Sequence, residues 1–256
     1  MFGAIAGDVI GSVYERHHIK TTEFQLFQKY SRFTDDTVLT VATAYAILHK
    51  VDYALAYRQF GRQYPDAGYG GAFFSWIFKD DSKPYNSWGN GAAMRVSPVG
   101  FAFDTIGQVL DEAKCTAKVS HNHPEGIRGA QAVALAVFLA RKQVSKITIK
   151  KEIVHRFQYD LNRTVESIRP YYRFDVSCQG SVPEAIISFL DADNFETAVR
   201  NAISLGGDSD TLACIAGGIA HAFYKKIPDN IVRDVRERLP ETFLEIIDSF
   251  ETIYLP

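Results

Sequence analysis

The stretch PEGIRGAQAVALAVFLARK, residues 124–142, decides the fold class of this 256-residue chain. It opens with Pro124 and Glu125 and ends with Arg141 and Lys142, the residue types favoured at the start and at the end of a helix. The residues between these ends are Ala-rich and apolar. The pattern therefore predicts a helix over residues 124–142.

Similar helical patterns extend over most of the chain. They predict further helices at residues 37–48, 185–190, 197–205, 212–224 and 230–239. Ser181 to Glu184 and Asp193 to Glu196 resemble capping boxes ahead of two of these helices. Residues 144–149 fit a short strand, although their lysines also fit the start of a helix. Because no Gly/Ser-rich linker, repeat or charge block divides the sequence, we expect one compact all-α, multi-helix domain over residues 1–256.

The composition excludes several classes of protein. Lys and Arg number 28 against 30 Asp and Glu, and hydrophobic residues make up 46% of the chain. This balance argues against a disordered chain and against non-specific nucleic-acid binding, which needs a basic excess. Cys115, Cys178 and Cys214 lie in no CxxC motif, so a disulfide framework or zinc site is not expected. The apolar runs fit neither a signal peptide nor a membrane span, and we expect a cytoplasmic protein.

Small residues recur with helical spacing near both ends of the chain. Gly3, Gly7 and Gly11 are four residues apart and would lie along one face of a helix. Ala216, Gly217 and Gly218 form a similar group. Glycine weakens a helix, so these positions predict a close approach of another backbone.

Two acidic clusters are the strongest chemical signal. The first acidic cluster, residues 34–37, is Thr-Asp-Asp-Thr, and the second acidic cluster, residues 206–211, is Gly-Gly-Asp-Ser-Asp-Thr; each precedes an apolar helix. One carboxylate is enough to cap a helix, whereas two adjacent carboxylates repel each other. A divalent cation would relieve the repulsion, and ligands that are all oxygen favour Mg²⁺ or Mn²⁺. The residues alone leave open a shared metal site or two separate helix caps.

Other hydrolase signatures are missing. The chain has no GxSxG, GxxxxGK[ST] or HExxH motif and no His-Asp dipeptide. Asp35-Asp36 also lacks the third acid spaced as in prenyl-diphosphate synthases.

Motifs along the whole sequence resemble the ADP-ribosylglycohydrolase family, which includes the dinitrogen-reductase-activating glycohydrolase. The combination of TDDT with GGDSDT, in this order and separation, is specific. The matching segments are GAIAGDVIGSVYE at 3–15, FTDDTVLTVA at 33–42, GNGAAMRVSPVG at 89–100, SHNHPEGIRGAQAVA at 120–134, GSVPEAIISFL at 180–190 and NAISLGGDSDTLACIAGGIAHAFY at 201–224.

The resemblance implies an all-α domain with a binuclear Mg²⁺ centre. The metal ligands of the family match Thr34, Asp35, Asp36, Asp208, Asp210 and Thr211. Glu15 matches an acid on a mobile loop near the substrate ribose, and Gly89-Asn90-Gly91 matches the loop beside the ribose and diphosphate. His121 matches the histidine of a TH-x-x-P motif and follows Ser120 here instead of Thr.

Several of these residues have simpler interpretations. Glu15 fits an ordinary solvent-exposed acid, and Asn90 between two glycines fits a turn. His121 and His123 fit caps of the helix that starts at Pro124. Four aromatic residues fit either adenine stacking or the core, namely Tyr69, Phe73, Trp76 and Trp88.

The function that the resemblance implies is hydrolysis at C1 of the distal ribose in an ADP-ribosyl adduct, carried by a protein or a small molecule. Asp36 or Glu15 would handle the protons, and a metal pair would hold the ribose and activate water. Two alternatives are a non-catalytic ADP-ribose-binding or structural member and a hydrolase of another N- or O-glycoside. The leaving group would depend on residues 63–86 and 163–179, which are the least family-like segments.

Overall fold

The stretch at residues 124–142 forms the predicted helix. In the computed structural model, which describes residues 1–80 and 83–255, this helix is α8 (Pro124–Arg141). Nδ1 of His123 accepts a hydrogen bond from the backbone N–H of Glu125 at 3.1 Å and caps the helix. The capping interpretation is therefore confirmed for His123.

Helices make up the rest of the fold. They are α1 (Phe2–Gly11), α2 (Asp35–His49), α3 (Tyr53–Gln63), α4 (Gly71–Ile77), α5 (Gly91–Met94), α6 (Ser97–Ala102), α7 (Ile106–Lys118), α9 (Lys146–Phe157), α10 (Val165–Ile168), α11 (Cys178–Leu190), α12 (Phe195–Ser204), α13 (Ser209–Tyr224), α14 (Asp229–Arg236) and α15 (Glu241–Tyr254). Residues 1–80 and 83–255 contain no strand, only an isolated antiparallel bridge between Gly89 and Ser177. The all-α fold class is confirmed. No helix in these ranges is both long and apolar enough to cross a membrane.

Two predicted helix starts are wrong in position. The hydroxyl of Ser177 accepts from the N–H of Gly180 at 3.0 Å, so α11 begins ahead of the predicted capping box and includes Pro183. The cap of α12 is Asn194, whose side chain accepts from the N–H of Thr197 at 2.8 Å, one residue later than expected. The strand interpretation of residues 144–149 is also wrong, because Lys146 begins α9.

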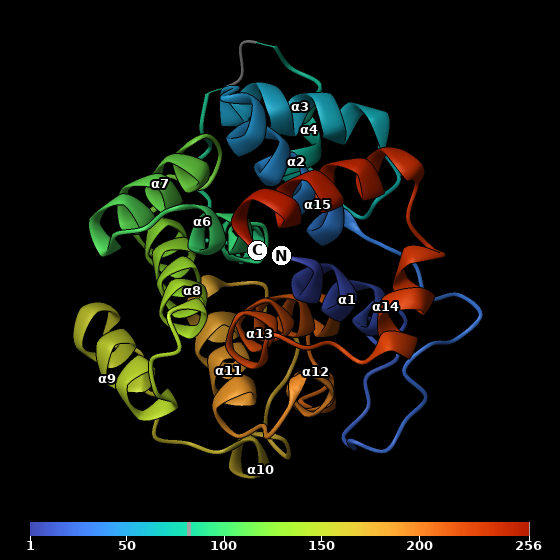
Figure 1. The fold of residues 1–256 in the computed structure, drawn as a ribbon, viewed down its shortest axis with the longest axis vertical. Helices are drawn as coiled ribbons and strands as arrows, with labels where there is room; N and C mark the ends of the chain where they lie inside the picture. The colour runs from blue at the N-terminus through green and yellow to red at the C-terminus, as the bar shows by residue number, and fades with distance from the viewer. Residues whose placement is uncertain (81–82, 256) are drawn as a thin grey trace.

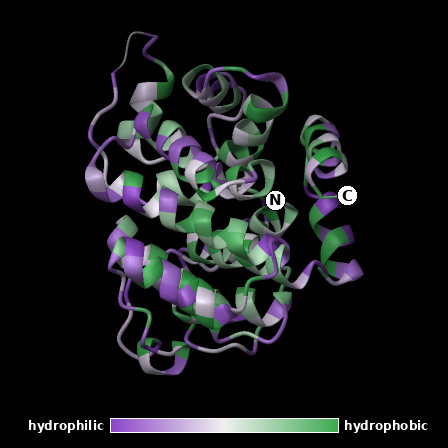
Figure 2. Cartoon of the chain, turned by 60° about the vertical axis from the view of Figure 1, so that its left-hand side comes forward, coloured by the Kyte–Doolittle hydropathy of each residue, from purple (hydrophilic) through white to green (hydrophobic). Residues whose placement is uncertain are grey.

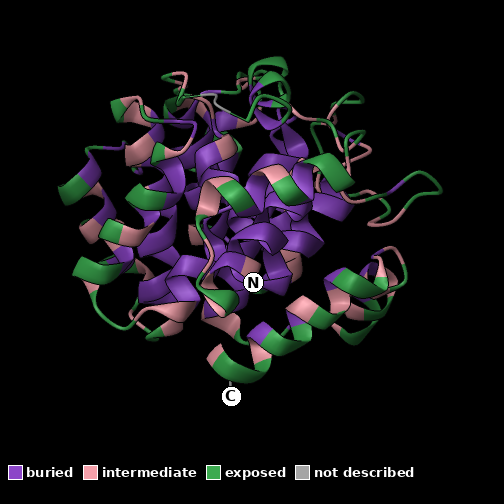
Figure 3. Ribbon diagram, turned by 90° about the horizontal axis from the view of Figure 1, so that it is seen from above, coloured by how far each residue is buried: buried purple, intermediate pink, exposed green. Residues whose placement is uncertain are grey.

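Helix α13 lies at the centre of the fold, beside α1, α8, α11 and α12 (Figure 1). Its residues from Ser209 to Ala222 are buried, as are all residues of α1. Apolar segments gather along these inner helices, and polar residues lie mainly on the outer ones (Figure 2). The buried residues likewise lie mainly on the inner helices, and the exposed ones on the outer helices and loops (Figure 3). The core therefore surrounds α13, whose N-terminal end carries the second acidic cluster.

The close contact of α1 with α13 confirms the small-residue prediction. A side chain at Gly7 would overlap the backbone carbonyl of Ala213, and one at Gly217 would overlap that of Gly3. Gly3 also donates its N–H to Nδ1 of His221 at 3.3 Å, which is a buried structural role for this histidine. The two backbones therefore approach more closely than any side chain at these positions allows.

Candidate active site

The fold brings the two acidic clusters together. Helices α2 and α13 both begin at the same cavity, each within one of the clusters. The hydroxyl of Thr211 lies 3.4 Å from Oδ2 of Asp36, and that of Thr34 lies 3.5 Å from the same oxygen. The clusters therefore form one site, although each also starts a helix.

The first acidic cluster is held by a residue that the sequence analysis did not single out. Asp8 of α1 is fully buried and accepts hydrogen bonds from the N–H and hydroxyl of Thr34 at 2.9 and 2.7 Å. It also accepts from the N–H of Thr37 at 3.1 Å and from the Thr37 hydroxyl. The signal for this role was present in the sequence as a lone acid inside an apolar, glycine-containing helix.

The second acidic cluster depends on its backbone. Gly206 has φ +67°, a conformation that L side chains rarely adopt, and it turns the chain into α13. Oδ2 of Asp208 accepts from the Asn90 side-chain amide at 2.7 Å. Oδ1 of Asp210 accepts from the N–H of Thr211 at 3.0 Å. Asn90 therefore links the loop at residues 89–91 to this cluster.

Burial and mutual repulsion dominate the electrostatics of the clusters. Burial, and then the charges of Asp8 and Asp208, raise the pKa of Asp35 to about 8. Burial, and then neighbouring carboxylates, raise the pKa values of Asp36 and Asp210 well above the ordinary value. The pKa of Asp208 is also raised by burial. Ionised side chains here need a cation to offset their repulsion.

One carboxylate oxygen of the first acidic cluster lacks a protein partner. Oδ1 of Asp36 is buried and has no hydrogen-bond partner within the described residues. The nearby Cys214 thiol lowers the pKa of Asp36, but it is a weak donor and lies 3.3 Å from the Met94 carbonyl, which accepts from it. An orphaned carboxylate oxygen among carboxylates and hydroxyls suits a hard divalent cation. In residues 1–80 and 83–255, no three His, Cys, Asp or Glu side chains already form a cluster able to hold a metal.

The site opens into a cavity of about 420 Å³. This volume falls in the range of small-molecule pockets. All the predicted site residues line it, namely Glu15, Thr34, Asp35, Asp36, Gly89, Asn90, Gly91, His121, Asp208, Asp210 and Thr211. Sequence reasoning missed the other polar lining residues, including Arg16, Arg32, Tyr85, Ser87 and Arg95.

Glu15 is half-buried in the cavity wall. Burial, and then the charge of Asp208, raise its pKa, while Arg16 and Arg32 lower it. Glu15 therefore faces the second acidic cluster, with basic side chains beside it. The solvent-exposed interpretation of this acid is wrong.

Another part of the cavity wall combines the loop at residues 89–91 with His121. The N–H of Asn90 donates to the Val176 carbonyl at 2.8 Å. Nδ1 of His121 lies 2.8 Å from the Ser120 hydroxyl, and the ring is buried. Of the four aromatic residues considered for adenine stacking, only Phe73 lines the cavity.

One family model matches the chain over residues 1–254, and its description is ADP-ribosylglycohydrolase. The chain belongs to the ADP-ribosylglycohydrolase family. ADP-ribosylhydrolase ARH3 of Mus musculus is 28% identical to it over 330 residues, which cover 97% of this chain and 86% of that protein. ARH3 of Homo sapiens is 27% identical, with 97% and 88% covered. A solved structure named ADP-ribosylglycohydrolase-related protein complex shares the fold, with a TM-score of 0.74, 20% identity and coverage of 98% and 96%.

In this member of the ADP-ribosylglycohydrolase family, both segments expected to decide the leaving group reach the cavity. Gly68, Phe73 and Tyr85 line it from residues 63–86, of which 81 and 82 lie outside the described residues. Phe174 and Val176 line it from residues 163–179 and are 49% and 44% exposed.

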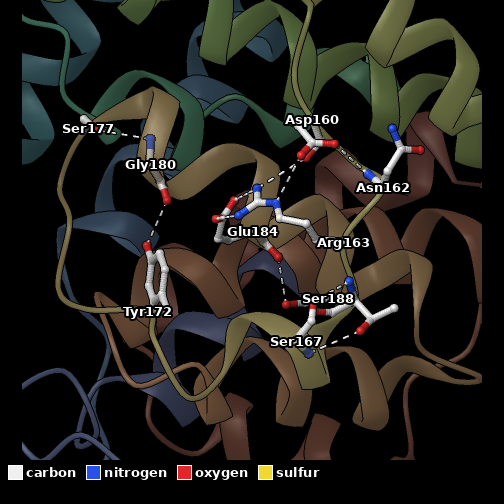
Figure 4. Close-up of polar contacts among 10 residues, drawn as sticks. Asp160, Asn162, Arg163, Ser167, Tyr172, Ser177, Gly180, Glu184 and Ser188 are labelled. Carbon is white, nitrogen blue, oxygen red and sulfur yellow. Dashed lines mark hydrogen bonds and ion pairs between the residues drawn. The ribbon is translucent and has the colours of Figure 1, made fainter.

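Side-chain contacts with α11 hold the second of these segments in place (Figure 4). The Tyr172 hydroxyl donates to the Gly180 carbonyl at 3.0 Å. The guanidinium of Arg163 forms two hydrogen bonds with the Glu184 carboxylate, at 2.7 and 3.1 Å. Two parallel hydrogen bonds fix the orientation of the Arg163 and Glu184 side chains as well as their distance. The segment that carries Phe174 and Val176 is therefore attached to α11 through the contacts of Arg163 and Tyr172.

Proposed function

We propose that this ADP-ribosylglycohydrolase hydrolyses the glycosidic bond at C1 of the distal ribose in ADP-ribosyl adducts, using a binuclear magnesium centre. The observation that carries the proposal is the convergence of the two acidic clusters at Asp36 and Thr211 inside a cavity of about 420 Å³. The family and the similarity to ARH3 support the ADP-ribosyl part of the substrate.

The orphaned Asp36 oxygen and the repelling carboxylates support the metal part of the proposal. The residues that would hold the two ions are Thr34, Asp35, Asp36, Asp208, Asp210 and Thr211. Such ions, Mg²⁺ or Mn²⁺, supply positive charge that binds hydroxyl groups and lowers the pKa of water.

Residues of the chain itself would transfer the protons and orient the substrate. Glu15, with a raised pKa, holds a proton more readily than an exposed acid, and its position in the cavity wall supports a role in proton transfer. Asp36 is the second candidate for proton transfer. Gly89, Asn90 and His121 also line the cavity and would orient the nucleotide portion.

In the proposed reaction, a water oxygen bonds to C1 of the ribose as the bond from C1 to the leaving group breaks. The leaving group gains a proton, and the attacking water loses one. The ribose passes through an oxocarbenium-like state. The substrate is an ADP-ribosylated protein or a small-molecule ADP-ribosyl adduct.

The experiment is an ADP-ribose release assay on arginine-, serine- and acid-linked ADP-ribosyl peptides, together with free glycosides. We expect release in Mg²⁺ from at least one adduct, and loss of about 100-fold or more with EDTA or in Asp208→Asn. Asp193→Asn, at an exposed position, is the control. Unchanged activity under both perturbations would contradict the metal mechanism. Tight calorimetric ADP-ribose binding without turnover of any adduct would indicate a binding protein, and cleavage of free glycosides alone would indicate a different substrate.

A further inference from the structure

A buried arginine lies in the cavity wall near His121. Arg95 is fully buried, and its guanidinium lies 4.3 Å from the centre of the Tyr57 ring and 5.5 Å from that of Phe73. No carboxylate within the described residues forms an ion pair with it, and its Nε and Nη1 atoms have no hydrogen-bond partner there. A buried charge without a counter-ion is expensive, so this arginine needs an explanation beyond packing.

The bonds that Arg95 does make lead to His121. Nη2 of Arg95 donates to the Thr116 carbonyl at 2.8 Å and to the Ser120 hydroxyl oxygen at 3.0 Å. The same hydroxyl lies 2.8 Å from Nδ1 of His121. The three side chains therefore form one hydrogen-bonded chain that ends on the imidazole ring.

The chemistry of the guanidinium determines which group donates and which accepts in each of these hydrogen bonds. A guanidinium only donates, so the Ser120 oxygen must accept from it. The hydroxyl is then free to donate its own hydrogen to Nδ1 of His121, and hydrogen bonds aligned in this way strengthen one another. Burial, and then the Arg95 charge, lower the pKa of His121, which favours the neutral ring. A neutral ring that accepts at Nδ1 carries its hydrogen on Nε2.

Nε2 faces the substrate side of the wall. A Cβ atom at Gly91 would lie 3.1 Å from Nε2, and one at Gly89 would lie 3.6 Å from it. The ring nitrogen that holds the hydrogen therefore points at the loop of residues 89–91 on the cavity surface.

We propose that Arg95, acting through Ser120, is a positioning residue that fixes His121 as a donor at Nε2 toward an electron-rich oxygen of the substrate. The inference deepens the proposed function, since it takes the ligand of this cavity to be ADP-ribose. It assigns Arg95 and Ser120 no contact with the reacting atoms. In the competing arrangement the Ser120 hydroxyl donates to the Tyr85 hydroxyl, a bond that partly offsets the rise in the pKa of Tyr85 caused by burial, and the imidazole hydrogen lies on Nδ1.

The direct test is ¹⁵N NMR of the histidine side chains in metal-free, ligand-free protein, because the imidazole shifts distinguish the two tautomers. His121→Gln assigns the signal among seven histidines. We expect hydrogen on Nε2 in the wild type and in Ser120→Thr, which keeps the hydroxyl, but a tautomer mixture in Ser120→Ala and Arg95→Lys. Ser188→Ala, which removes a buried hydroxyl bonded to the Glu184 carbonyl, is the matched control and should leave the signal unchanged.

Binding provides the second readout. Calorimetry should show the Kd for ADP-ribose rising about tenfold in Ser120→Ala, the scale of one hydrogen bond to a charged group, and recovering in Ser120→Thr. A wild-type ring with hydrogen on Nδ1, or an unchanged tautomer in Ser120→Ala, would overturn the inference even if the enzyme is fully active. If the tautomers behave as expected but no adduct is cleaved, the positioning role stands and the proposed reaction fails. Thermal denaturation shows whether Arg95→Lys is folded. If it is not, Arg95→Gln is the second variant for the arginine, because Ser120→Ala tests only the bond from the hydroxyl to the ring. An unchanged tautomer in a folded Arg95 variant would overturn the role of Arg95.

Discussion

The two acidic clusters reach the same cavity by different means. Side-chain hydrogen bonds hold the first acidic cluster, because Asp8 accepts from both Thr34 and Thr37. Close backbone contact holds the second, since a side chain at Gly11 would overlap Ser209 and Asp210. Both supports come from α1, which is buried along its whole length.

The difference shows how one helix aligns two distant segments. Gly7 and Asp8 are neighbours in sequence, yet one serves the contact with α13 and the other serves the start of α2. Removing the hydrogen bonds should loosen one cluster, whereas adding volume at the glycines should separate α1 from α13 and affect the whole fold. Substitutions in α1 can therefore separate the two supports.

The largest effect is expected from Gly7→Ala. The new methyl group would overlap the Ala213 carbonyl, and backbone cannot move aside as a flexible side chain can. Urea denaturation should show a loss of about 3 kcal/mol in the free energy of unfolding. The matched control is Gly107→Ala in α7, where a Cβ meets nothing within 4 Å and should stabilise the helix by about 0.5–1 kcal/mol. Equal behaviour of the two variants would refute the role of close backbone contact.

Asp8→Asn should have the next largest effect. An amide places an N–H group among donors from Thr34 and Thr37, so at least one buried hydrogen bond is lost. The expected loss is about 2 kcal/mol, measured by urea denaturation in EDTA. Thr37→Val removes a single donor to Asp8 and should lose about 1 kcal/mol. If Asp8→Asn is as stable as the wild type, Asp8 does not hold the first acidic cluster.

The smallest effect depends on pH and tests the contact between α1 and α13. Burial, and then the N-terminal ammonium, lower the pKa of His221 well below its ordinary value. Below pH 6.5 the unfolded chain binds a proton at this histidine that the folded chain does not, so stability falls as pH falls. His221→Asn keeps an acceptor for the Gly3 N–H but cannot titrate.

The wild type should therefore lose about 1 kcal/mol relative to His221→Asn between pH 6.5 and 5.5. Thermal denaturation of both proteins across this range measures the difference, and effects of the carboxylates cancel in the comparison. Parallel stability curves for the two proteins would show that His221 does not stay neutral in the fold.

The sequence could predict features that depend on local contacts better than those that depend on distant ones. The start of α8 was predicted correctly, with a local cap at His123. The start of α11 was not, because its cap Ser177 lies beside Gly89, a bridge partner far away in the chain. Asn194 was missed by one residue, because the neighbouring Asp193 is an equally good capping residue.

The residues around the cavity were predicted through motifs of the family, whereas their convergence depends on packing that no local pattern encodes. Asp8 and Arg95 were missed as functional residues. Each is a buried charged residue in an apolar stretch, and its role depends on contacts with residues far away in the sequence, which no local pattern reveals.

The measurement that tests the central claim most directly is the number of Mg²⁺ ions bound per chain, by calorimetry, in the wild type, Asp36→Asn and Asp208→Asn. Because the two clusters meet at Asp36 and Thr211, we predict two ions for the wild type and weakened binding of both in either variant. Thermal denaturation without metal confirms that each variant is folded. Binding that survives intact at one cluster when the other is altered would contradict a single shared site.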